Sequence, residues 1–122
     1  MTDLTHLTAL EQAKLIRDRK ISAVELLDAT LAQVRKVDGR PGQVGATETA
    51  EDLEKVHAFI LLTEREAREK AAEVDRRIAA GEAVGPLAGV PYSAKDVFCT
   101  KGIQTTAAAK ILDKFVDRKS VV

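Results

Sequence analysis

The chain has 122 residues, a length that suits one small domain or one part of a larger domain. Its 19 basic residues balance 19 acidic ones, so the net charge gives no indication of binding to nucleic acid or to an anionic membrane. A single cysteine excludes an intramolecular disulfide. No apolar run approaches the roughly 18 residues of a membrane span, and we expect a soluble, cytoplasmic protein.

Three helix starts share the pattern S/T-x-x-E, in which the hydroxyl and the glutamate each bond to a backbone amide of the other residue. These capping boxes are expected at Thr8–Glu11, Ser22–Glu25 and Thr63–Glu66. The first predicts a short amphipathic helix that ends near Lys20. The second predicts a helix that ends at Asp38-Gly39-Arg40-Pro41, because glycine adopts the left-handed cap and proline cannot continue the helix. This second helix carries an apolar stripe formed by Val24, Leu27, Leu31 and Val34.

The rest of the chain alternates loops, short apolar runs and helical patterns. Gly81 is the expected end of an alanine-rich helix that follows the third capping box. In chain order the sequence predicts a loop over 39–50, a polar helical turn over 51–55, a strand over 57–62, a helix over 64–80, a loop with a strand over 85–98, and a short helix over 107–115.

This order of elements indicates an α/β fold, with N-terminal helices followed by the first strands of a larger mixed sheet. Two or three strands cannot complete a sheet that is covered on both faces, so we expect the chain to be the first part of a larger domain. The expected division is a helical hairpin over 1–38, a loop over 39–56 and the start of the α/β core over 57–122.

Lys95 places an ammonium group inside a segment that otherwise consists of small and apolar residues. The ordinary interpretation is a solvated lysine at the end of a strand, beside Asp96. The functional interpretation is a buried lysine, because burial disfavours the charged amine and a neutral amine can act as a general base toward serine hydroxyls. In a strand, Asp96 would point to the opposite face.

Other candidate groups are less promising. Cys99 lacks a nearby histidine, so we expect a buried or half-buried structural thiol. His6 is expected at the surface, and His57 at the end of a helix or before a strand. With no acidic cluster around the two histidines, we expect no metal site.

The segment Pro86–Phe98, with its G-V-P-x-x-x-K-D core, strongly resembles the amidase signature family. Within that family the chain is most similar to the A subunits of glutamyl-tRNA(Gln)/aspartyl-tRNA(Asn) amidotransferases. The resemblance extends over nearly the whole chain, which would make residues 1–122 the N-terminal part of a single amidase-signature domain. The residues that carry it elsewhere are Thr100-Lys101-Gly102, Thr105-Thr106, Ile21–Leu26, Val37-Asp38 and His57-Ala58-Phe59.

The resemblance implies that Lys95 is the base of a Ser–cis-Ser–Lys triad. The two serines would lie in and before a glycine/serine-rich stretch downstream of this chain, and Ser22, Ser93 and Ser120 receive no role. The complete subunit would hydrolyse glutamine and pass ammonia to its partners, the B and C subunits. One partner would use ATP and Mg²⁺ to amidate misacylated Glu-tRNA(Gln) or Asp-tRNA(Asn). This chain would bind no cofactor and would be inactive alone.

Two alternatives remain open from the sequence. One alternative to the amidotransferase subunit is that the chain is part of a stand-alone amidase that acts on small amides. The other is that it is a non-catalytic docking module that binds a partner through the apolar stripe of the second helix. The segment Asp117–Ser120 also departs from the resemblance, because relatives run into a segment that contains proline and tyrosine there.

Overall fold

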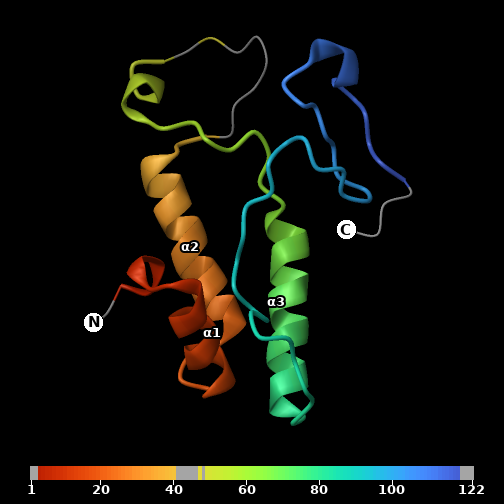
Figure 1. Ribbon diagram of the computed structural model, residues 1–122. Helices are drawn as coiled ribbons and strands as arrows, with labels where there is room; N and C mark the ends of the chain where they lie inside the picture. Colours follow the sequence, from red (N-terminus) through yellow and green to blue (C-terminus); the bar gives the residue numbers. More distant parts are fainter. Residues whose placement is uncertain (1–2, 41–46, 48, 119–122) are drawn as a thin grey trace. The chain divides into compact units, whose positions relative to one another are not determined.

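The structure is a computed structural model that describes residues 3–40, 47 and 49–118, and these form two units, Met1–Pro91 and Tyr92–Val122 (Figure 1). Parts of the expected loop over 39–50 and of the divergent segment Asp117–Ser120 lie outside the described residues. The helices are η1 (Leu4–His6), α1 (Ala9–Arg17), α2 (Ala23–Val37), η2 (Asp52–Glu54), α3 (Glu64–Ala79) and η3 (Lys110–Leu112), where η marks a single 3-10 turn.

Two of the three predicted capping boxes are confirmed. The Thr8 hydroxyl accepts from the Glu11 amide at 3.3 Å, and the Glu11 carboxylate accepts from the Thr8 amide at 2.8 Å. Ser22 and Glu25 make the same pair of bonds. The third prediction is wrong, because Thr63 precedes α3 without a side-chain cap and has a ψ of 57° instead of the extended conformation that a capping box needs.

The core of the first unit lies where α1, α2 and α3 meet. Ile16 of α1 and Leu26 of α2 are fully buried, and Ala71 of α3 is buried against them. Leu27 and Leu31 of the α2 stripe are also buried, 5% and 6% exposed, so this stripe packs into the core of the chain itself. The stripe is therefore not the free surface that the docking-module alternative requires.

Helices α2 and α3 lie side by side and run antiparallel (Figure 1). At one end, the Asp75 carboxylate of α3 accepts from the Ala23 amide at 2.7 Å and from the Val24 amide at 3.2 Å. A carboxylate at the first turn of a helix satisfies free amides and complements the helix dipole. At the other end, Arg35 of α2 pairs with Glu64 of α3 at 2.5 Å.

The C-terminal end of α2 is fixed by Asp38, which is 3% exposed. Its carboxylate accepts from the Ala58 amide at 2.5 Å and from the Phe59 amide at 3.2 Å. Gly39 follows with a φ of 77° and Gly81 follows α3 with a φ of 75°, so both predicted glycine ends are confirmed.

The described residues are mostly helical, and the mixed sheet expected from the sequence is not among them. The predicted strands over 57–62 and 85–98 are irregular chain, and the β pairing in the described residues is limited to one antiparallel bridge between Gln104 and Val116. A strand forms only where another segment supplies its ladder of hydrogen bonds, and the amides of Ala58 and Phe59 bond to Asp38 instead.

The predicted helix over 107–115 is reduced to the single turn η3. Ala107 and Ala108 have positive φ values of 46° and 56°, which a right-handed helix cannot accommodate. The backbone amide of Ala107 bonds instead to the carbonyl oxygen of Asp96. Helix formation in this segment is therefore prevented at its first residues.

The segment that precedes the second unit packs directly on the helical core. Gly89 has a φ of 85°, and a Cβ atom built there would lie 2.8 Å from the Cβ of Ala23 and 3.0 Å from the Cδ1 of Ile16. The Arg17 guanidinium holds the same segment by donating to the carbonyl oxygen of Pro86 at 2.5 Å. Only glycine fits this position without displacing the core.

The chain between α2 and α3 is organised around the Asp52 carboxylate, which is largely buried. The carboxylate accepts from the Arg40 guanidinium at 2.7 and 2.9 Å. It also accepts from the amide and hydroxyl of Thr49 at 2.7 and 2.8 Å. The Arg40 hydrogen bond, followed by those from Thr49, holds the pKa of Asp52 well below its usual range.

This arrangement predicts a loss of stability in acid. A carboxyl group with a lowered pKa in the folded state stabilises the fold above its ordinary pKa of about 4, and this contribution disappears as the pH falls toward the lowered value. We expect Asp52→Asn to lower the free energy of unfolding at pH 5 to 7 and to flatten its decline below pH 4. Urea unfolding followed by circular dichroism at a series of pH values measures both effects.

Several other carboxylates also have lowered pKa values, so the comparison with the unsubstituted chain isolates the contribution of Asp52. Asp113→Asn is the matched control, because Asp113 is exposed. Identical pH profiles for Asp52→Asn and the unsubstituted chain would contradict the prediction.

Candidate functional site

Lys95 lies in the second unit, in irregular chain at the start of a turn. The turn is closed by the Phe98 amide, which donates to the Lys95 carbonyl oxygen at 3.0 Å. The expectation of a buried lysine is not met in this chain, because Lys95 is exposed. The neighbouring apolar side chains are exposed as well, with Tyr92 at 83% and Phe98 at 64%. The sequence pattern that suggested burial thus corresponds to an apolar surface that the described residues leave uncovered.

Asp96 is bonded to Thr106 and not to the neighbouring lysine. Its carboxylate accepts from the Thr106 amide at 2.9 Å and from the Thr106 hydroxyl. These two bonds hold the pKa of Asp96 below its usual range. Lys95 takes part in none of the ion pairs among the described residues.

The segment that bears Thr106 is itself fixed within the second unit. Thr105 is 4% exposed, its amide donates to the Phe115 carbonyl oxygen at 3.1 Å, and its hydroxyl donates to the Phe98 carbonyl oxygen at 3.3 Å. The Gly102 amide donates to the Asp117 carbonyl oxygen at 2.8 Å. Hydrogen bonds therefore connect the turn at Lys95 with residues 105–107, Thr105 with Phe115, and Gly102 with Asp117.

The structure places no serine as a partner of Lys95 within the described residues. Ser22 is engaged in the cap of α2, Ser93 is exposed on the same segment as Lys95, and Ser120 lies outside the described residues. Among the described residues, Lys95 thus has no serine partner that could act as the nucleophile.

The remaining candidate groups form no second site. Cys99 is exposed, so the expectation of a buried structural thiol is wrong. His6 is exposed, whereas both ring nitrogens of His57 contact carbonyl oxygens, those of Arg40 at 3.2 Å and Asp52 at 2.9 Å. Among the described residues, no group of three or more His, Cys, Asp or Glu side chains could hold a metal ion.

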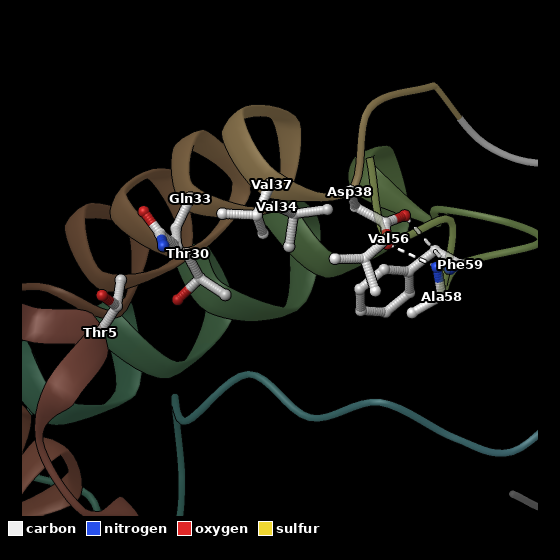
Figure 2. A pocket seen from close by; sticks show the side chains of 9 residues that line it. All are labelled: Thr5, Thr30, Gln33, Val34, Val37, Asp38, Val56, Ala58 and Phe59. Atoms are coloured by element: carbon white, nitrogen blue, oxygen red, sulfur yellow. Dashed lines mark hydrogen bonds between the residues drawn. The ribbon is translucent and has the colours of Figure 1, made fainter. Parts of the chain in front are cut away.

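A hollow of about 310 Å³ lies in the first unit, between α2 and residues 56–59. Figure 2 shows Val34, Val37, Val56 and Phe59 around it, with the Asp38 carboxylate bonded to the neighbouring amides. This carboxylate is the one charged group among the described residues that line the hollow, and it is already bonded, so the hollow offers no free group for chemistry. No pattern in the sequence indicated it.

The chain is similar to several curated proteins described as the A subunit of glutamyl-tRNA(Gln) amidotransferase. The protein from Desulforamulus reducens is 40% identical over 114 residues, which are 93% of this chain and 20% of the relative. The protein from Salinispora tropica is 45% identical over 112 residues, 92% of this chain and 20% of the relative. The protein from Cutibacterium acnes is 40% identical over 116 residues, 95% of this chain and 20% of the relative.

The chain thus spans about a fifth of the length of these relatives and corresponds to their N-terminal part. No solved structure matches it significantly. In the described residues no helix has the length and apolar character required to cross a bilayer. Residues 46–122, which include Lys95 and Thr106 and make up more than half of the chain, match the Amidase family. The chain therefore belongs to the Amidase family.

Proposed function

We propose that this chain forms the N-terminal portion of a glutamine-hydrolysing amidotransferase subunit that supplies ammonia for the transamidation of misacylated Glu-tRNA(Gln) or Asp-tRNA(Asn). The observation that carries the proposal is the 40–45% identity over more than nine-tenths of the chain to relatives described as the A subunit of such an enzyme. The B and C subunits are the proposed partners, and ATP and Mg²⁺ would serve the partner that activates the tRNA-bound carboxylate. The chain alone is expected to be inactive.

In this proposal Lys95 is the general base of the glutaminase reaction. Its neutral amine accepts a proton from one serine hydroxyl, which in turn accepts the proton of the nucleophilic serine. The serine oxygen then attacks the amide carbon of glutamine. The C–N bond breaks, ammonia leaves with the proton that Lys95 accepted, and water hydrolyses the resulting acyl-enzyme to glutamate. Both serines and the oxyanion donors belong to the remaining four-fifths of the subunit.

The same proposal accounts for the exposed apolar surface around Lys95. A lysine acts as a base when burial disfavours its charged form, and Lys95 is exposed in this chain. The side chains of Tyr92, Val97 and Phe98 are more than half exposed and would be covered by further strands of the amidase-signature domain. We propose that residues 57–62 and 85–98 become strands of the mixed sheet when these further strands pair with them.

A hybrid subunit tests the proposal. In this hybrid, this chain replaces the matching N-terminal segment of the Salinispora tropica relative, and the product is expressed with its partner subunits. We expect it to release glutamate from glutamine and to amidate Glu-tRNA(Gln). The natural Salinispora protein is the positive control, and the same protein without the segment is the inactive control.

Gel filtration and circular dichroism establish whether the hybrid folds and assembles. An assembled hybrid that does not hydrolyse glutamine would contradict the proposal. Hydrolysis of small amides in preference to glutamine would support the stand-alone amidase alternative.

A further inference from the structure

We propose that Asp96 is a positioning residue for the glutaminase reaction: by binding Thr106, its carboxylate fixes the turn that carries Lys95 and leaves the lysine amine without an ion-pair partner. The inference rests on the proposed function, because it assigns a role to the neighbour of the proposed base. It concerns only residues of the second unit.

Asp96 connects two parts of the chain that lie ten residues apart. Its carboxylate accepts from both the amide and the hydroxyl of Thr106, and its carbonyl oxygen accepts from the Ala107 amide at 2.8 Å. Side chain and backbone of one residue thus bind two consecutive residues of the opposite segment. The side chain and the carbonyl group of Asp96 are therefore both held, which restrains the backbone next to Lys95.

The opposite segment is suited to act as an anchor. Thr105 is buried and bonded to Phe115 and Phe98, so the backbone that presents the Thr106 amide is held from its other side. Thr106 is itself partly buried, which limits competition from water for its bonds to the carboxylate. The bonds of the anchor are therefore all formed by residues of the second unit.

The charge of Asp96 supports the same role. A carboxylate that paired with the Lys95 amine would favour the charged amine and oppose its action as a base. Thr106 supplies two donors to this carboxylate, and Lys95 is absent from the ion pairs among the described residues. Thr106 thus holds the negative charge at a place where it does not bind the proposed base.

The test uses the hybrid subunit with its partner subunits and measures glutamine hydrolysis as a function of pH. Asp96→Ala removes both bonds of the carboxylate to Thr106, whereas Thr106→Val removes the hydroxyl bond and leaves the backbone amide of residue 106 in place. A displacement of about 1 Å at a reacting group costs roughly a hundredfold in rate. We expect each to lower kcat by about 10- to 100-fold with little change in KM and with no shift of the acid limb of the kcat/KM profile. The double variant should be no slower than the slower single variant, because both remove one interaction.

Two further variants complete the design. Thr106→Ser keeps the hydroxyl and the amide, so we expect it to retain nearly full activity. Asp113→Asn removes a carboxylate from an exposed position of the same unit and should leave kcat unchanged. A second measurement on the 122-residue chain follows the Asp96 carboxyl by NMR, and Thr106→Val should raise the pKa of this carboxyl toward its ordinary value.

The outcomes separate this inference from the function on which it rests. An inactive but assembled hybrid would contradict the proposed function and, with it, the role of Asp96. An active hybrid whose Asp96→Ala variant retains full kcat would contradict the positioning role alone. A shift of the acid limb in Asp96→Ala, with no effect of Thr106→Val, would show that Asp96 acts as the counterion of Lys95 and would contradict the positioning role. An unchanged Asp96 pKa in Thr106→Val would show that the Thr106 hydroxyl does not hold the carboxylate and would contradict the anchor.

Discussion

In the hybrid subunit, Lys95→Ala should lower kcat for glutamine hydrolysis by about 10⁴-fold, because the members of a catalytic triad act as a unit and the loss of one removes most of the rate. The residual rate would come from substrate binding and from the oxyanion donors that the rest of the subunit supplies. Steady-state measurement of glutamate release gives kcat and KM separately. We expect KM to change little, because a base acts on the reacting proton and not on substrate binding.

Two controls distinguish a base from a simple positive charge. Lys95→Arg keeps a cation at the site, but a guanidinium remains protonated and cannot accept the proton of a serine, so this variant should be as inactive as Lys95→Ala. Lys101→Ala removes an exposed lysine of the same unit and should retain activity. Full turnover by Lys95→Ala would eliminate this residue from the mechanism, and full turnover by Lys95→Arg would leave it an electrostatic role only.

Exposure of Lys95 in this chain does not conflict with that expectation. A lysine acts as a general base when its amine is buried, and this burial depends on the residues that pack around it. The turn at Lys95 and its connection through Asp96 to Thr106 are complete within the second unit. The cover over the amine is absent from the described residues. In the proposed function, the second unit would position Lys95, and other parts of the subunit would bury its amine.

The helices could be predicted from the sequence because their signals are local. The boxes at Thr8 and Ser22 and the glycine ends at Gly39 and Gly81 lie within a few residues of the helix ends that they define. The failed box at Thr63 shows the limit of such signals. Its spacing is correct, but the backbone conformation of the cap residue is set by the chain that enters the helix.

The sheet and the environment of Lys95 could not be predicted in the same way. Runs such as His57–Leu62 indicate a strand only if a partner supplies the ladder, and the sequence of one segment does not specify whether that partner is present. The same applies to burial around Lys95, which the apolar pattern suggested and the described residues do not provide. In a chain that spans about a fifth of its relatives' length, predictions of non-local structure fail before predictions of local structure do.

The motif predicts Lys95 as a site residue, but no pattern in the sequence indicated the residues that hold its turn. The bonds from Asp96 to Thr106 join residues ten apart without a recognised local pattern. The carboxylates of Asp38 and Asp75 were missed for the same reason, since each binds amides more than 15 residues away in sequence. In the sequence, such residues resemble ordinary surface acids.

Gly89→Ala should destabilise the chain more than either Gly81→Ala or Gly85→Ala, because it combines backbone strain with overpacking of the core. An alanine at a φ of 85° costs about 1–2 kcal/mol through steric strain. The added Cβ would also lie 2.8 Å from the Cβ of Ala23. Ala23 is fully buried, and its Cβ is bonded directly to the backbone, so this atom cannot move aside. Overpacking of this kind costs about 1–3 kcal/mol, for a total of about 2–5 kcal/mol.

The two other glycines separate these contributions in urea unfolding followed by circular dichroism. Gly81 has a φ of 75° with no atom within 4 Å of its added Cβ, so Gly81→Ala measures the backbone strain alone. Gly85 has neither a positive φ nor a close neighbour, and Gly85→Ala should change the free energy of unfolding by less than about 0.5 kcal/mol. If Gly89→Ala cost no more than Gly81→Ala, the segment before Pro91 would not rest on the helical core. A larger cost shows that the core of α1, α2 and α3 extends to the chain that leads to the proposed base.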